Sequence, residues 1–583
     1  MPACSFLDLP NELIIAILSN PVISPRDIYI VSCLSKRLNI LAIPIYLSGH
    51  GIPEPERELS LHVLDWGPYD LQFRNTILRP STSVTTRFRP DTLSGLNVST
   101  NITQVKHFKC FFQDPAKKGL RNTLQEAYNL SRAVERTARF VHRLKYVDTA
   151  EIYLVWDPYY VTVLGKKHIS HVSIPEVNEW TKSFGRLLNL IVERGCTSLT
   201  LQYDIPQALK PTFRLRSSNP ITKTLSNVFQ YVQNRRDKQP PSLHWELERP
   251  IHEGKIDPSS VASVPLSHLA EESNSMVTLS IHSPALLLPP FANWTLSLLY
   301  SHSSLTCITF AHLTFSEEIW TTLLPLIADA VSDRLTKLSF FSQCTKLTAE
   351  NLVRFLARLP HLTHLSIDRL FCSRFQLSGT RAMFNSTPAY LPRLQVLQAP
   401  TELVSLLLNA QPPSFVSRNN DEASTGLPQL RCLTVYPSSQ LQQPSNYSES
   451  TSTVNALISQ IKRRSPGRQV EYTLDLHLWD QINEVEVELL ASRQDSARIV
   501  FLDITRVILF PHYCNPTILC LWLKLLFPHL KTLVFTCQIA AQPDQVSLLE
   551  AEVVEELIEK LATTCPAVET LVVANETYKL GKN

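Results

Sequence analysis

The feature that most constrains this chain is a short apolar motif that recurs along most of its length. The motif has the form Φ-x-x-Φ-x-Φ, where Φ is an apolar residue, and a proline often stands just before it. Between Met276 and Leu430 the successive copies start 29, 30, 27, 32 and 36 residues apart. The alternating end of the motif predicts a short strand with one buried face. The clearest copies start at Leu362, Leu430 and Leu530, and weaker ones at Val105, Met276, Leu305, Leu335, Leu394, Ile504 and Val568.

Amphipathic helix patterns lie between these strands. Ser316, Thr348 and Ser547 each precede a series of apolar residues with helical spacing, and each is a residue type that suits a helix N-cap. One strand and one helix every ~30 residues are typical of stacked repeats, whose parallel strands form an inner sheet. The predicted fold class is therefore α/β.

This arrangement resembles the leucine-rich repeat proteins. The asparagine or cysteine that those repeats carry after the strand is mostly absent, and Glu402 and Ser438 stand at two of the equivalent positions. The resemblance implies an irregular leucine-rich-repeat-like solenoid with a parallel inner sheet over residues 101–583. The alternative is a doubly wound α/β domain, against which the even spacing and the lack of a glycine-rich turn both argue.

Three stretches interrupt the repeat pattern, near residues 206–275, 411–426 and 437–453. The third is rich in Ser, Gln, Pro and Asn, a composition that disfavours a packed core. The first contains a helix pattern at 222–235 and a strand pattern at 243–247, so it could hold a degenerate repeat.

The first 48 residues differ in character, because 28 of them are apolar. Pro10, Ser24 and Ser35 mark the starts of three short helices, and Pro44 is expected to kink or break the third. In the first helix, residues 13–18 are all apolar, so every face of that helix is apolar. A module of this size cannot bury so much apolar surface by itself. The surplus must contact the rest of the chain or a partner.

The same region resembles an F-box in the order and spacing of its residues. Leu9-Pro10-Asn11-Glu12-Leu13 is followed by Ile17-Leu18, Asp27-Ile28, Val31-Ser32 and Leu34-Ser35-Lys36-Arg37, although the tryptophan common near the end of the family's pattern is missing. The resemblance implies an F-box at 1–48 and a connecting segment at 49–100. It also implies binding to a Skp adaptor, which links F-box proteins to a cullin and a RING subunit. The residues that it places in adaptor contact or in the module's core are Leu9, Pro10, Leu13, Ile14, Ile17, Leu18, Ile28, Val31 and Leu34.

Two basic runs have simpler interpretations. The run of Arg132, Arg136, Arg139, Arg143 and Lys145 has helical spacing and is predicted to form a solvated helix face. The run 462–464, together with Arg468, has two interpretations. One is a nuclear address or a phosphate contact. The favoured one is that these cations complement the dipole at the C-terminal end of a helix that begins near Val454.

Composition and motif searches exclude several functions. Only 13 of 583 residues are glycine, and neither a phosphate-binding loop nor a catalytic motif is present. His168 and His171 are the only close histidine pair, and the twelve scattered cysteines, without a C-x-x-C, favour reduced thiols. A net charge of +3 gives no sign of nucleic-acid binding, and no apolar run is long enough to span a membrane. We expect no cofactor, no metal, and a cytoplasmic or nuclear location.

Together, the F-box and leucine-rich-repeat resemblances imply a non-enzymatic substrate receptor of an SCF-type ubiquitin ligase, which recruits an unknown protein substrate. The alternatives are an adaptor-binding scaffold without a ligase role and a divergent α/β enzyme. Substrate contacts are expected on the inner face, at positions between the strand leucines. These positions are Thr363, His364, Ser366, Arg431, Thr434, Lys531 and Thr532.

Overall fold

The computed structural model describes most of the chain. The described residues are 9–63, 91–112, 123–154, 174–203, 213–215, 245–247, 261–313, 315–341, 344, 346–368, 391–408, 427–436, 447–464, 469–476, 487–488, 491–492, 500–509, 515–535, 551–573 and 576–580. They form two compact units, Met1–Arg334 and Leu335–Asn583.

Three helices open the first unit: α1 (Asn11–Leu18), α2 (Pro25–Ser32) and α3 (Lys36–Ser48). The Oγ of Ser24 accepts a hydrogen bond from the Asp27 amide at 3.2 Å, and Ser35 caps α3 in the same way. The predicted break at Pro44 does not occur, since α3 runs through it. Proline removes one helical hydrogen bond, but the residues around it, including Ile43 and Tyr46, are buried and hold the helix in place.

A parallel sheet follows in the first unit. Its strand order is β1-β2-β3-β4-β7-β8, which is the order of the chain. A separate antiparallel pair is formed by β5 (Phe213–Leu215) and β6 (Trp245–Leu247). The strands of the main sheet are β1 (Glu58–His62), β2 (Gln104–Phe112), β3 (Tyr146–Leu154), β4 (Ser198–Tyr203), β7 (Thr278–His282) and β8 (Cys307–Ala311). The helices are α5 (Thr92–Val98), α6 (Thr123–Arg143), α8 (Ile174–Glu193), α10 (His268–Ser273), the 3-10 helix η5 (Pro284–Leu287), α11 (Ala292–Ser301) and α12 (Glu317–Val331).

The second unit repeats the arrangement. Its strands pair in chain order from β9 to β17, and all pairings are parallel except the last, between β16 and β17. The strands are β9 (Lys337–Phe341), β10 (His364–Ile367), β11 (Val396–Pro400), β12 (Cys432–Tyr436), β13 (Glu471–Asp475), β14 (Arg506–Leu509), β15 (Thr532–Phe535), β16 (Thr570–Val573) and β17 (Glu576–Lys579). The helices are α13 (Ala349–Leu356), α14 (Thr401–Leu408), α15 (Tyr447–Arg464), α17 (Pro516–Leu526) and α18 (Ala551–Thr564).

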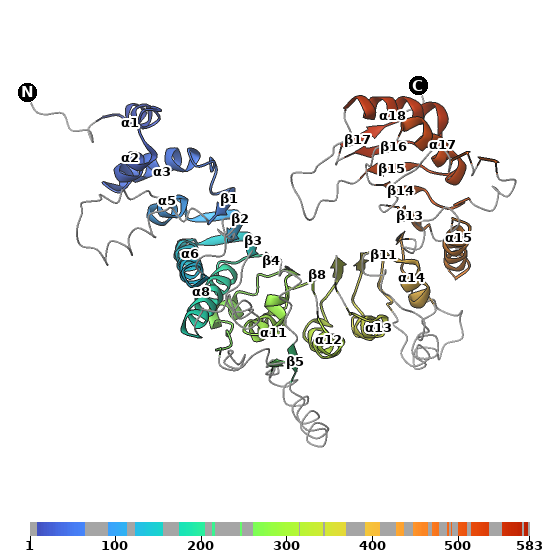
Figure 1. The fold of residues 1–583 in the computed structure, drawn as a ribbon, viewed down its shortest axis with the longest axis horizontal. Coiled ribbons are helices and arrows are strands. Elements are labelled where there is room, and N and C mark those ends of the chain that lie inside the picture. Colours follow the sequence, from blue (N-terminus) through green and yellow to red (C-terminus); the bar gives the residue numbers. More distant parts are fainter. Residues whose placement is uncertain are drawn as a thin grey trace, which may run out of the picture. The chain divides into compact units, whose positions relative to one another are not determined.

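The predicted α/β class and parallel sheet are confirmed. In each of the six motif copies between Met276 and Leu430, the strand begins two residues after the first apolar residue of the motif. For example, one motif begins at Leu362 and its strand at His364. The strand order never reverses within a unit, unlike that of a doubly wound sheet. In each unit the helices lie along one side of the strands, which leaves the other face of the sheet without a described helix (Figure 1).

The first repeat begins earlier than the sequence predicts. Strand β1 lies inside the segment 49–100 that the sequence analysis treats as a connection, and it pairs in parallel with β2. Its two buried leucines, Leu59 and Leu61, are too short a pattern to be recognised without their neighbours. Likewise α15 begins at Tyr447, not near Val454, because its first turns are polar and show no apolar periodicity.

The predicted interruptions have different outcomes. Within 206–275 the described strands β5 and β6 stay outside the main sheet, where β4 pairs directly with β7. The pattern at 222–235, the stretch 411–426 and residues 437–446 lie outside the described residues.

The core lies between the sheet and its helices. In the first unit, Trp180 and Phe184 of α8 stack with ring centroids 5.4 Å apart, and Phe291 meets both rings edge-on. In the second unit, Trp522 of α17 is buried against Phe527. Large aromatic residues therefore fill the space between the strands and the helices.

Candidate partner-binding surface

The N-terminal helices carry most of the exposed apolar surface of the described chain. Twelve large apolar side chains are exposed in the described residues, and seven of them lie between residues 13 and 40. We call these seven the apolar patch: Leu13, Ile15, Ile17, Val22, Ile30, Leu34 and Ile40. So dense a group on a short segment is typical of an interaction surface.

Helix α1 shows how the patch arises. Ile14 and Leu18 point inward and are almost fully buried, whereas Leu13, Ile15 and Ile17 are 51%, 41% and 40% exposed. Residues four apart lie on one face of a helix, so a single buried stripe leaves the other faces uncovered. The sequence prediction that this module cannot bury all its apolar residues is confirmed for α1.

The nine residues that the F-box resemblance selects divide into two groups. Ile14, Leu18 and Ile28 belong to the core of the module, and Leu9 and Val31 are half-buried. Those open to a partner are Pro10, Leu13, Ile17 and Leu34. The sequence selection omitted four exposed residues, Ile15, Val22, Ile30 and Ile40. The unbroken apolar run at 13–18 already pointed to Ile15, and the spacing of four residues links Ile30 to Leu34.

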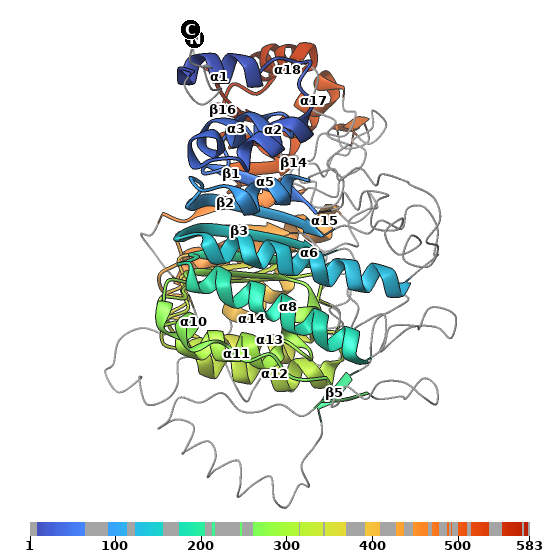
Figure 2. The same cartoon turned by 90° about the vertical axis from the view of Figure 1, so that its left-hand side faces the viewer.

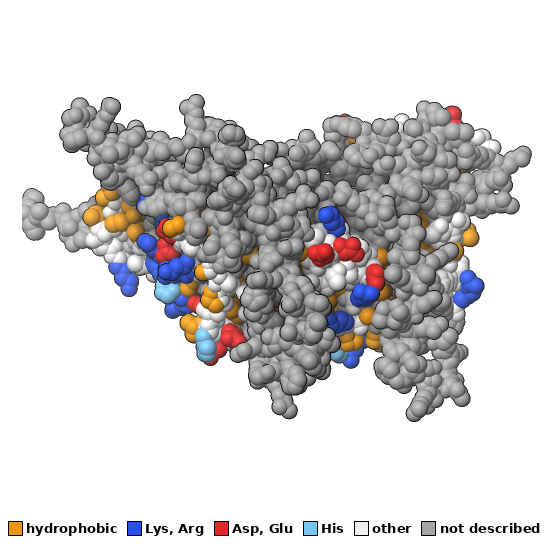
Figure 3. Space-filling model, turned by 60° about the horizontal axis from the view of Figure 1, so that its bottom comes forward, with side chains coloured by type: hydrophobic (Ala, Val, Ile, Leu, Met, Phe, Trp, Pro, Cys, Tyr) orange, Lys and Arg blue, Asp and Glu red, His pale blue; other side chains and the backbone are white. Residues whose placement is uncertain are grey.

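Helix α1 lies on the side of the module that is farther from the sheet. In the first unit, α1 is followed by α2 and α3 and then by α5 and β1 (Figure 2). A partner can therefore approach α1 without displacing the first repeat. Elsewhere on the described surface, acidic and basic side chains are interspersed in the view of Figure 3.

Arg37 fixes the start of α1 to α3. Its guanidinium donates to the backbone oxygen of Leu9 at 2.6 Å and to Oδ1 of Asn11 at 2.8 and 2.9 Å. Charge-assisted hydrogen bonds of this kind hold geometry well. The conformation of the Leu9-Pro10 segment is thus set by a residue at the other end of the module.

Asn39 joins the module to the first repeat. Its side-chain amide is buried, donates to the carbonyl oxygens of Ser32 and Val98, and accepts from the amide and the hydroxyl of Thr100. All four hydrogen bonds are between 2.9 and 3.0 Å. A buried amide with its hydrogen-bonding capacity filled specifies one arrangement of the segments around it.

A second contact joins Tyr46 of α3 to α5. The Tyr46 hydroxyl donates to the carbonyl oxygen of Asp91 at 3.0 Å, and its ring lies against Gly95. A Cβ atom on Gly95 would stand 2.6 Å from that ring, so the close approach requires glycine. Burial raises the pKa of Tyr46 further above its ordinary value, which keeps the hydroxyl a donor.

The basic face of α6 is not simply solvated, which corrects the sequence prediction. Arg136 makes a bidentate ion pair with Asp91, at 2.5 and 2.7 Å, and Arg143 donates to the last carbonyl oxygens of α5, those of Leu96 and Asn97. Burial alone would raise the pKa of Asp91, but the hydrogen bonds and charge of Arg136, with those from Ser94, lower it overall. These arginines therefore hold α5, and through it the module. We call Asn39, Tyr46, Asp91, Gly95 and Arg136 the junction.

The residues predicted to face a substrate form an ordered pattern. Ser366, Thr434 and Thr532 lie in one cross-strand row of the second unit's sheet. The row, read from β9 to β17, is Ser339, Ser366, Gln398, Thr434, Thr473, Arg506, Thr532, Thr570 and Lys579. Because residues of one row share a face of the sheet, the structure brings together three positions that are far apart in sequence.

The remaining predicted positions are placed less favourably. His364 lies in the neighbouring row beside Lys337, while Thr363, Arg431 and Lys531 precede their strands. Burial, and secondarily the charge of Lys337, lowers the pKa of His364. The Thr363 hydroxyl donates a hydrogen bond to the carbonyl oxygen of Thr336 at 2.9 Å.

Thr434 requires a correction, because it is only 9% exposed and cannot serve as a contact position. Its cross-strand partner on β11, Gln398, donates a hydrogen bond to the hydroxyl of Tyr436. Tyr436 stands two residues after Thr434 on β12. Two long side chains therefore flank the short Thr434 side chain. Strand periodicity predicted correctly which face of the sheet carries Thr434, but it did not predict that neighbouring side chains cover this residue.

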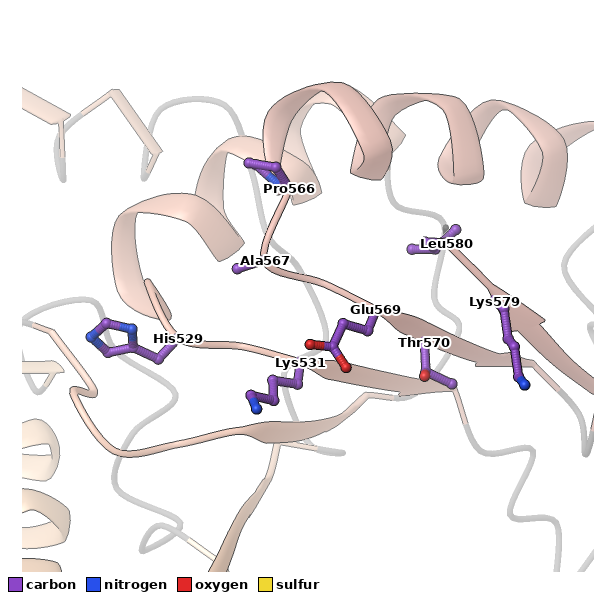
Figure 4. A pocket seen from close by; sticks show the side chains of 8 residues that line it. All are labelled: His529, Lys531, Pro566, Ala567, Glu569, Thr570, Lys579 and Leu580. Atoms are coloured by element: carbon purple, nitrogen blue, oxygen red, sulfur yellow. The ribbon is translucent and has the colours of Figure 1, made fainter. Parts of the chain in front are cut away.

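Lys531 and Thr570 line an open pocket of about 700 Å³ near the C-terminal end of the second unit. Figure 4 shows that its polar side chains do not point to one centre: Glu569 extends toward Lys531, His529 points away from them, and Lys579 stands on β17, two strands from Lys531. Such an arrangement does not assemble a ligand cage.

The described residues offer no metal centre and no membrane span. No three His, Cys, Asp or Glu side chains in the described parts are grouped as metal ligands, and His168 and His171 lie outside the described residues. No described helix is both long and apolar enough to cross a bilayer. The eight described cysteines form no disulfide.

Comparisons with known proteins add little. No protein-family model matches the chain, and no curated protein matches it. Among solved structures, one similar chain comes from the crystal structure of the Rad7 and Elc1 complex in yeast, with 10% identity and a TM-score of 0.22. That likeness covers 58% of this chain and 100% of the other. The argument for function therefore rests on the residues of this chain.

Proposed function

We propose that this protein is a substrate-recognition subunit of an SCF-type ubiquitin ligase. In this proposal α1–α3 form an F-box that binds a Skp adaptor, and the open face of the repeat sheet binds a protein substrate. The observation that carries the proposal is the apolar patch, whose position coincides with the F-box-like residues. Covering apolar surface stabilises a complex by ~25 cal/mol per Å², so the patch would supply much of the adaptor affinity.

The proposed role needs no catalytic residue in this chain. A receptor that holds a substrate near a charged conjugating enzyme raises the effective concentration of the substrate's lysines. The junction supports this role, since its hydrogen bonds join the adaptor-binding module to the first repeat and fix the orientation of one to the other.

Co-expression with the host's Skp adaptor and a pull-down test the proposal. We expect the wild-type chain to retain adaptor in stoichiometric amount, and the double variant Leu13→Asp/Ile17→Asp to retain none. The matched controls are Leu269→Asp on α10 and Leu521→Asp on α17, because these leucines are also exposed but lie outside the module. Both controls should retain adaptor as the wild type does.

The outcomes separate the alternatives. A soluble, folded wild-type chain that retains no adaptor would refute the proposed function. Adaptor together with cullin in the wild-type pull-down supports a ligase receptor, whereas adaptor without cullin supports the scaffold that binds adaptor alone.

A further inference from the structure

The open face of the first unit's sheet carries a row of stacked aromatic rings. His62 of β1, Phe111 of β2 and Tyr153 of β3 are cross-strand partners, and each lies on the side of its strand opposite the buried apolar residues. The ring centroids are 4.6 and 4.3 Å apart, and the interplanar angles are 5° and 10°. The stacking holds the three rings side by side, and we call them the aromatic ridge.

Small polar residues surround this ridge. The next row across β1–β4, β7 and β8 is Ser60, Lys109, Glu151, Thr200, Ser280 and Thr309. The row beyond it is Glu58, His107, Thr149, Ser198, Thr278 and Cys307. Most of these side chains are short, so a ligand segment can reach the ridge and the charged residues beside it.

The charges on this face are not balanced. Lys109 Nζ pairs with Glu58 at 3.2 Å. Glu151, whose direct cross-strand neighbour is Lys109, accepts a hydrogen bond from the Tyr153 hydroxyl at 2.8 Å and forms no ion pair of its own among the described residues. Burial, followed by the charge of His312, lowers the pKa of His282, and the charge of Glu151 partly opposes this shift.

A carboxylate without an ion pair beside an aromatic ridge suits a long basic side chain. The methylene groups of arginine can pack along ring edges while its guanidinium donates to a carboxylate, and arginine does this better than lysine because its donors form a planar fork. We infer that the open face of β1–β4 binds an arginine-bearing segment of a protein substrate, with Glu151 as the acceptor and the His62–Phe111–Tyr153 ridge as the apolar contact. This inference rests on the proposed function and names the substrate class for it.

Binding of synthetic peptides to the full-length chain tests the inference. The probe is a fluorescently labelled peptide of alternating arginine and serine, compared with peptides in which lysine or glutamate replaces arginine. Fluorescence anisotropy should rank the peptides arginine, then lysine, with glutamate not bound. Glu151→Gln should weaken binding of the arginine peptide by at least about tenfold, as the loss of a charge-assisted contact would.

Two further variants complete the design. Phe111→Ser removes the central ring and should also weaken binding, while Glu179→Gln, the same charge change on the helix side of the first unit, should not. Thermal unfolding of each variant separates a binding defect from misfolding. Equal binding of the arginine peptide by Glu151→Gln and the wild type, or tighter binding of the glutamate peptide, would overturn the inference. Adaptor pull-down is independent of these peptides, so its failure is distinguishable from theirs.

Discussion

Helices α1 and α12 are both rich in large apolar residues, yet they bury them to very different extents. In α12, none of the large apolar side chains is exposed, and Trp320, Leu323 and Ile327 are almost completely buried. In α1, three of them are exposed. Helix α12 packs on a neighbouring helix within a layer beside a sheet, whereas the main packing partner of α1 is α3 alone. Apolar residues are therefore buried in a helix of the array, whereas some of those in α1 stay exposed.

The comparison teaches where function can lie. Inside the array, apolar residues are explained by the core, because each repeat covers the next. In α1–α3, apolar residues of the same kinds remain exposed, which is typical of an interaction surface. The junction makes this end a firm part of the first unit.

The largest expected difference is between two adjacent isoleucines of α1. Ile14 is fully buried and Ile15 is 41% exposed. We expect Ile14→Ala to cost ~2–5 kcal/mol of local stability through lost burial and a cavity, and Ile15→Ala to cost less than ~0.5 kcal/mol. Hydrogen exchange of the α1 amides in the full chain measures both. Equal loss of protection in the two variants would mean that α1 is packed on both faces. That result would contradict the difference between α1 and α12.

Loss of the Arg136–Asp91 ion pair should have the next largest effect. Arg136→Ala leaves a half-buried carboxylate without its cation and should destabilise the junction by ~1–3 kcal/mol. Because the pKa of Asp91 is lower in the folded state, the stability from this pair is present above the ordinary pKa of aspartate and is lost as the pH falls through the lower folded value. Acid unfolding of the N-terminal helices, followed by hydrogen exchange, should therefore shift to higher pH in this variant. An unshifted transition would contradict the role of the pair.

Overpacking at Gly95 should be milder. In Gly95→Ala the new methyl group meets the Tyr46 ring at 2.6 Å, so the ring or α5 must move. We expect a cost of ~1–2 kcal/mol, which Tyr46→Leu should partly relieve. Thermal unfolding of the two single variants and the double variant measures this coupling, and simple additivity of the two losses would argue against a tight junction.

The smallest expected effect is at the helix caps, where the two regions should behave alike. The Oγ atoms of Ser24 and Ser316 accept amide hydrogen bonds from Asp27 and Ile319. Alanine at either position should cost ~1 kcal/mol. Chemical denaturation measures both losses. A clearly smaller loss at Ser24 would show that the module's helices are looser than those of the array.

The sequence alone predicted the repeated elements well. The positions of the strands after Met276, the caps of α2, α3, α12 and α13, and the parallel sheet all follow from local patterns. Local patterns work here because each repeat contacts mainly its neighbours. They missed β1 and the first turns of α15, where the pattern is short or polar.

The candidate site was predicted in outline only. The sequence placed an apolar partner surface in residues 1–48, and it found three residues of one cross-strand row, Ser366, Thr434 and Thr532. It could not separate Ile14 from Ile15, foresee that Gln398 and Tyr436 flank Thr434, or recognise Arg136 as a partner of Asp91.

What the sequence by itself determined is the kind of element at each position and the excess of apolar residues at the N-terminal end. Only the tertiary structure decided which of those residues stay uncovered and which distant side chains form the junction and the aromatic ridge. The physical reason is that helix and strand periodicities are set over a few residues, whereas exposure and side-chain partnership depend on which segments pack together. Such contacts, like that of Asn39 with Thr100 and that of His62 with Phe111, join residues about fifty or more positions apart.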